Sequence, residues 1–297
     1  IRCLSKKMGG ISFKKIANRK RKSIIEYIGF TSLSNISNLI ILNSDSILIS
    51  ALSYNGLTNA GIYTIAFFIG SILDIPKKII IQLFAPIFSQ YWSEKKTDKL
   101  EKLYLKLTVN SLTIGLFIAS LLIVNLNLIY EVMPNGEEYL SGKYIVFLIL
   151  YAKLVDLSCV APMCLLSQSN LYRYNLVFSL LVLMLSVLLN VVLIPIYGIV
   201  GAGITFAFCY TIYNLLRVLV IRYKLNLLPF NIKTLIILPM ILIVVFINAI
   251  PTSEIIIGSI LKSLMTLLFI TTILYKVEFS IDFNQLVNKS TSKIKFF

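Results

Sequence analysis

Long apolar runs alternate with short polar segments along the whole chain, and the polar segments hold most of the charged residues. A helix that crosses the hydrocarbon core of a bilayer needs about 20 mainly apolar residues. The pattern therefore predicts an all-α polytopic transmembrane bundle with about eight spans. The runs that reach or approach this length are 27–52, 58–82, 107–128, 144–166, 176–194, 199–220, 235–250 and 255–275.

The polar segments differ in charge in an alternating order. Residues 1–23 and 95–106 are strongly basic, and so are 217–233 and 276–295, whereas the segment after the third run carries Glu131, Glu137 and Glu138 with a single lysine. Lys and Arg are retained on the cytoplasmic side of a membrane. We therefore expect a multi-pass protein of the bacterial cytoplasmic (inner) membrane with both ends of this chain in the cytoplasm.

Composition agrees with a membrane protein and removes several function classes. Hydrophobic residues make up 58% of the 297 residues and charged residues 14%, whereas soluble domains carry about 25% charged residues. The net charge of +15 does not predict nucleic-acid binding, because the cations lie between apolar runs and not among stacking aromatics. The chain has no histidine, the commonest metal ligand and general base. We expect no enzyme activity, no catalytic residue, no metal and no cofactor.

Charged residues inside the second run are the clearest functional signal. Asp74, Lys77 and Lys78 surround Pro76, and Asp74, Lys78 and Gln82 share one face of an ideal helix. An ionisable group at the centre of a span costs about 2.5–3.5 kcal/mol on insertion scales, so it usually faces a partner or a wet cavity. The pattern predicts a polar stripe that lines a cavity, on a helix kinked at the proline.

A simpler interpretation of the same run is also open. The span could end near Pro76, with Lys77 and Lys78 as cytoplasmic anchors and residues 79–92 as a helix in the membrane interface.

Two further sets of polar residues lie inside apolar runs. Asn38 and Asp45 are in the first run, and Lys153 and Asp156 are in the fourth. Such groups either line the same cavity or hold helices together. Pooled ammonium groups favour a polyanionic head group such as a diphosphate, and the carboxylates could neutralise them or bind a coupling H+ or Na+. The predicted substrate or ion pathway comprises Asp74, Lys77, Lys78, Gln82, Asn38, Asp45, Lys153 and Asp156.

Three segments carry a family resemblance. They are NSDSILISALSYNGLTNAGIYTIAFFIGSILDIPKKIIIQLFAPIFSQYW at 43–92, MPNGEEYLSGK at 133–143 and LNVVLIPIYGIVGAGIT at 189–205. In this order they resemble the second half of bacterial polysaccharide-biosynthesis flippases of the O-antigen type. That family belongs to the multidrug/oligosaccharidyl-lipid/polysaccharide exporter superfamily, and the likeness covers most of residues 26–233.

The resemblance implies the C-terminal lobe of a MATE-like exporter followed by two extra helices. Such exporters have two six-helix lobes around a central cavity and move undecaprenyl-diphosphate-linked oligosaccharide between leaflets for surface polysaccharide and lipopolysaccharide synthesis. The chain starts with Ile, so we expect a C-terminal fragment whose partners include membrane lipids and a missing N-terminal lobe. The expected parts are a basic arm joining the lobes (1–23), a six-helix lobe (24–222), two additional helices (223–276) and a cytoplasmic tail (277–297).

Other functions remain open at this point. A cation-coupled drug exporter of the same superfamily would have a more acidic and aromatic cavity. A membrane-embedded polysaccharide polymerase or ligase would need a sizeable outer loop carrying Arg, His or carboxylates, and the outer segments here are short and lack Arg and His. A non-transporting remnant of a truncated gene is the third alternative.

Overall fold

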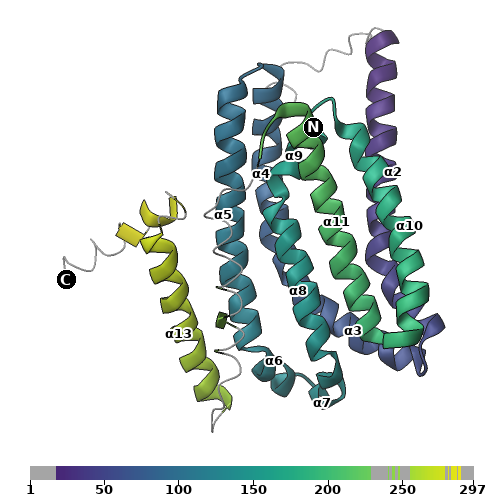
Figure 1. The fold of residues 1–297 in the computed structure, drawn as a ribbon, viewed down its shortest axis with the longest axis vertical. Coiled ribbons are helices and arrows are strands. Elements are labelled where there is room, and N and C mark those ends of the chain that lie inside the picture. Colours follow the sequence, from purple (N-terminus) through teal and green to yellow (C-terminus); the bar gives the residue numbers. More distant parts are fainter. Residues whose placement is uncertain are drawn as a thin grey trace, which may run out of the picture.

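The structure is a computed structural model that describes residues 18–228 and 255–277, together with residues 240, 243, 244, 247, 280, 282–285, 287 and 288. All regular elements in this part of the chain are helices, most of which stand side by side in a bundle (Figure 1). The basic arm lies almost entirely outside the described residues, and the seventh predicted run lies mostly outside them. The helices are α2 (Asn18–Leu52), α3 (Gly56–Gly70), η1 (Ser71–Leu73), α4 (Asp74–Ser93), α5 (Thr97–Val124), α6 (Leu126–Val132), α7 (Gly136–Tyr139), η2 (Leu140–Gly142), α8 (Lys143–Ser158), α9 (Val160–Gln168), α10 (Tyr172–Tyr197), α11 (Ile199–Leu225) and α13 (Ile255–Lys276).

Five helices of the described part are long and apolar enough to cross a membrane: α2, α5, α10, α11 and α13. A sixth candidate is the pair formed by residues 136–158 and 160–168, whose two halves meet at an angle of 49°. The all-α class and a multi-pass membrane protein are thus confirmed. The predicted number of about eight spans is not, because the described residues supply five or six.

The second predicted run, 58–82, does not form one continuous span. It is divided between α3, which has only 15 residues, and α4, with the 3-10 turn η1 between them. Pro76 is the third residue of α4. In an uninterrupted α-helix its ring would clash with the carbonyl of Ile72, and it has no N–H to donate. The sequence predicts a kink at this proline, whereas in the structure the helix is interrupted by the 3-10 turn just before it.

After this break, α4 stays within the bundle. It contacts α9 and α5 and runs alongside α5 in Figure 1. The alternative interpretation, in which residues 79–92 leave the span as an interfacial helix, therefore does not describe this arrangement.

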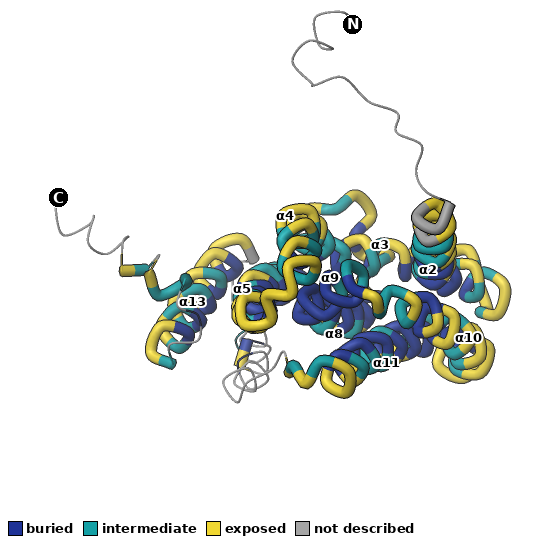
Figure 2. Tube along the Cα trace, turned by 90° about the horizontal axis from the view of Figure 1, so that it is seen from above, coloured by how far each residue is buried: buried dark blue, intermediate teal, exposed yellow. Residues whose placement is uncertain are grey.

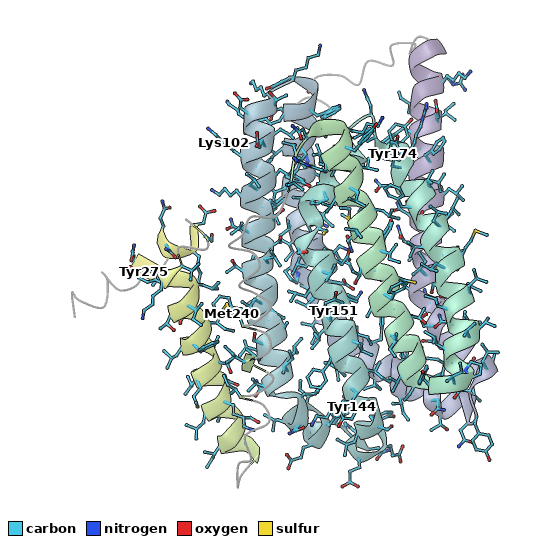
Figure 3. All side chains as sticks on the ribbon, viewed as in Figure 1. Lys102, Tyr144, Tyr151, Tyr174, Met240 and Tyr275 are labelled. Carbon is cyan, nitrogen blue, oxygen red and sulfur yellow. The ribbon has the colours of Figure 1, made fainter. Side chains whose placement is uncertain are left out.

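The basic and acidic segments lie at opposite ends of the bundle. The α4–α5 turn, the α9–α10 turn and the end of α11 lie together at the upper end in Figure 1, while α6, α7 and the α10–α11 turn lie at the lower end. Figure 3 shows Lys102 towards the first end and Tyr144 at the second. We call these the basic end and the acidic end. The charge alternation in the sequence thus becomes a separation in space.

Burial is greatest around α8, α9 and α11, as the view along the bundle shows (Figure 2). Ile145, Ile149, Leu157 and Leu165 of α8 and α9 are fully buried. The outer faces of α2, α4, α10 and α13 carry exposed large apolar side chains, as expected of surfaces that lie in lipid. Lys153 and Asp156 of α8 and Arg217 of α11 therefore lie in the least exposed part of the molecule.

Candidate ion-pair site in the bundle interior

Helices α4 and α8 are joined by two reciprocal ion pairs. Lys153 Nζ lies 2.6 Å from Asp74 Oδ2, and the Lys77 ammonium pairs with the Asp156 carboxylate. Both pairs join residues 79 positions apart. This equal offset arises because Asp74 and Lys77 on α4, and Lys153 and Asp156 on α8, are each three residues apart and so share a helix face. Four of the eight predicted pathway residues, predicted as separate sets, thus form one cluster.

The two sides of this cluster differ in exposure. The side chains of Lys153 and Asp156 on α8 are 2% and 3% exposed, whereas those of Asp74 and Lys77 on α4 are 26% and 19% exposed. Helix α4 therefore presents the accessible half of the cluster, and α8 holds the buried half.

Helix α11 adds a third cation that the sequence interpretation placed elsewhere. The charge pattern predicts Arg217 to be the first cation of the basic segment 217–233, but its side chain is only 5% exposed and lies 3.7 Å from Asp156 Oδ1. Asn214 bridges the two, since its Nδ2 donates to Asp156 Oδ1 at 3.3 Å and its Oδ1 accepts from Arg217 Nη1 at 3.2 Å. The burial of Arg217 could have been expected from the sequence, because residue 217 falls inside the predicted apolar run 199–220.

Aromatic rings surround the buried ammonium of Lys153. Its Nζ lies 4.9 Å from the centre of the Phe67 ring and 5.8 Å from those of Phe206 and Tyr210. Ring faces attract a cation, most strongly where water is excluded. We define the buried charge cluster as Asp74, Lys77, Lys153, Asp156, Asn214 and Arg217; its three cations and two carboxylates leave one positive charge in excess.

Asp45 is at the centre of a separate buried polar group. It is 1% exposed and accepts hydrogen bonds from the Tyr63 hydroxyl at 2.8 Å and from Asn190 Nδ2 at 2.6 Å. Within the described ranges no Lys or Arg lies close enough to form an ion pair with it. Tyr63 stacks on Phe67, so a wall of rings links this group to Lys153.

The other predicted pathway residues lie outside both groups. Lys78 and Gln82 are exposed on α4, next to the exposed Ile79 and Leu83, and Asn38 is partly exposed on α2. None of the three makes a side-chain hydrogen bond or ion pair within the part of the chain that the structure describes. The predicted stripe is thus corrected, because Asp74 shares its cluster with Lys77 while Lys78 points away.

Two cavities open at the ends of the bundle, away from the buried charge cluster. One, of about 690 Å³, is lined by residues of the α4–α5 turn, including Trp92 and Lys95, and by the end of α11. The other, of about 730 Å³, lies at the acidic end beside Tyr130 and Glu137. None of the eight predicted pathway residues lines either cavity.

Comparisons with models of protein families, with curated proteins and with solved structures found no match to this chain. The family resemblance therefore stays a hypothesis. Among the described residues, no group of three or more acidic or cysteine side chains is placed to hold a metal ion.

Proposed function

We propose that this chain is part of an exporter that moves a lipid-diphosphate-linked oligosaccharide, of the undecaprenyl type, across the bacterial inner membrane. In this proposal the basic end faces the cytoplasm, as the distribution of Lys and Arg favours. The observation that carries the proposal is the buried charge cluster, in which cations outnumber carboxylates at a site inside a membrane bundle.

The excess cation favours an anionic guest. A buried charge is costly unless it is paired, and a diphosphate would bring several negative charges at once. Asp74 and Asp156 would hold the lysines while the site is empty. On substrate entry the phosphate oxygens would replace a carboxylate as the partner of an ammonium group, so the cations stay compensated in both states.

Transport then needs no covalent chemistry. Two conformations that expose the site to opposite leaflets are sufficient, provided that the substrate and the coupling ion bind them with different affinities. Asp45 is the candidate binding site for the coupling ion. As a buried carboxylate without a cationic partner among the described residues, it is the group whose charge a proton or Na+ would neutralise.

A cation-coupled drug exporter is the second candidate, and the aromatic wall beside Asp45 favours it. Stacked rings and a buried carboxylate are suited to organic cations. The positive excess at the neighbouring cluster argues against this function, since a cationic drug would be repelled there.

Binding measurements separate the two candidates. The full chain, reconstituted in lipid nanodiscs, would be titrated with undecaprenyl diphosphate and, separately, with a cationic dye. We expect the lipid diphosphate to bind, and Lys77→Ala to weaken its binding about tenfold, the equivalent of about 1.4 kcal/mol. The matched control, Lys78→Ala, removes a neighbouring exposed lysine and should have little effect. Binding of the dye alone, or equal effects of the two variants, would contradict the proposed site.

A further inference from the structure

We propose that Arg217 is a positioning residue. It is the permanent counter-ion of Asp156, and its presence allows Lys77 to leave that carboxylate and reach the diphosphate of the substrate. This inference rests on the proposed function and assigns a role to a residue that the sequence placed among the loop cations.

The two oxygens of Asp156 face different cations. Oδ2 accepts from Lys77, whereas Oδ1 faces Arg217 at 3.7 Å and accepts from the Asn214 amide at 3.3 Å. Taking one partner from a buried ion pair ordinarily leaves an uncompensated charge, which is strongly destabilising. Here the departure of Lys77 would leave Asp156 with Arg217, so the release of the lysine costs much less.

The two cations also differ in how firmly they are held. The Arg217 guanidinium stacks on Tyr213, 3.8 Å from the ring centre, and donates to Asn214. Its Nε is buried and has no hydrogen-bond partner among the described residues. Lys77 is the more exposed cation and has a flexible four-carbon stem. Arg217 is therefore the fixed partner and Lys77 the one that moves.

The other ion pair shows why the mobile cation is Lys77 and not Lys153. Within the described part of the chain, Asp74 forms an ion pair with Lys153 alone. Lys153 is also enclosed by three rings and is 2% exposed. Releasing Lys153 would leave Asp74 without a cation, whereas releasing Lys77 leaves Asp156 with one.

The first test needs no ligand. Acetylation of the Lys77 amine by acetic anhydride would be followed by mass spectrometry on the full chain in nanodiscs, with exposed Lys78 as the internal reference. In Arg217→Gln, Asp156 holds Lys77 alone, so we expect acetylation of Lys77 to slow by about fivefold, the lower end of ordinary coupling between interacting groups. Arg217→Lys keeps the charge and should stay close to the wild type. Adding Asp156→Asn to Arg217→Gln should restore or exceed the wild-type rate.

The second test uses undecaprenyl diphosphate. Arg217→Gln should weaken its binding about fivefold and the double variant should recover it, because the carboxylate that retains Lys77 is gone. If Arg217 touched the diphosphate itself, or served only to hold α11 in place, the double variant would bind no better than Arg217→Gln. Unchanged acetylation of Lys77 in Arg217→Gln, or the absence of recovery, overturns the inference.

Both tests remain decisive if a variant fails to fold or the ligand fails to bind. If Arg217→Gln does not accumulate, Asp156→Asn is compared with the double variant. Neither of these two proteins contains the Asp156 carboxylate, so Arg217 should no longer affect binding. Much weaker binding by the double variant than by Asp156→Asn contradicts the counter-ion role. Should the wild-type chain bind no lipid diphosphate, the proposed function fails. The acetylation rates then decide alone whether Arg217 compensates Asp156.

Discussion

Replacing Asp74 with Asn removes the carboxylate that neutralises a buried ammonium. Lys153 Nζ lies 2.6 Å from Asp74 Oδ2, and its side chain is 2% exposed. In the variant, Lys153 keeps the ring faces of α3 and α11 and the more distant Asp156 carboxylate as favourable neighbours. The asparagine fills nearly the same space, so the change is almost purely electrostatic.

The magnitude follows from the burial of the two partners. Removing one member of a buried pair typically costs about 3–5 kcal/mol. The cost is smaller here, because the Asp74 side chain is about a quarter exposed and the nearby Asp156 carboxylate still attracts Lys153. We expect the free energy of unfolding to fall by about 2 kcal/mol. Lys78→Gln, which changes an exposed neighbour, should stay within about 0.5 kcal/mol of the wild type.

Unfolding would be followed by SDS titration in mixed micelles, with the fluorescence of the sole tryptophan, Trp92, as the signal. The charge exchange Asp74→Lys with Lys153→Asp restores an ion pair and should recover about half of the loss. Recovery is incomplete because ring faces repel a carboxylate at position 153. The reasoning is refuted if Asp74→Asn lowers the free energy of unfolding no more than Lys78→Gln does. It is also refuted if the charge exchange costs as much as Asp74→Lys and Lys153→Asp measured separately and added together.

The remaining predictions concern packing, coupling and the C-terminal segment. Gly70→Ala would place a Cβ 2.4 Å from a side-chain carbon of α8, whereas Gly61→Ala meets nothing within 4 Å. We expect only Gly70→Ala to lower the free energy of unfolding, by about 1–3 kcal/mol. Equal midpoints of the two variants in SDS titration would contradict the packing of α3 on α8. Asp45→Asn should make transport of a lipid diphosphate into vesicles insensitive to imposed proton or sodium gradients, and unaltered gradient dependence would remove Asp45 as the coupling group. A hydrogen bond from Lys106 lowers the pKa of Asp282 below its ordinary 3.8, so the contact of Asp282 with α5 should persist from neutral pH down to that value and weaken as the pH falls through the lower folded pKa. Hydrogen exchange around Asp282, corrected for the intrinsic rate, measures this, and the Asp282→Asn variant should lack the transition.

Several features of this protein could be predicted from local properties of the chain. Apolar runs of about 20 residues require a nonpolar environment, and the backbone must then satisfy its own hydrogen bonds as helices. The break before Pro76 is equally local, because the missing N–H and the bulky ring act within one helical turn. The separation of basic and acidic ends needed only the alternation of segments along the chain.

The candidate site could be predicted only in part. Periodicity indicated that Lys153 and Asp156 share a face and that Asp74 lies near two lysines. It placed Lys78 and not Lys77 on the face of Asp74, which was wrong, because positions three and four residues along a helix lie on either side of the same line and spacing alone favours neither. Periodicity also did not predict that Asp74 pairs with Lys153, which lies 79 positions further along the chain. Nor did it assign Arg217 to their cluster.

Those pairings depend on how α4, α8 and α11 pack against one another. A side chain's neighbours on other helices are set by the rotation and depth of each helix in the bundle, and these follow from the interlocking of many apolar side chains at once. Residues with the same local pattern, such as Lys77 and Lys78, therefore differ in burial and in partners. That difference arises from the sum of contacts across the bundle, which no short stretch of sequence contains.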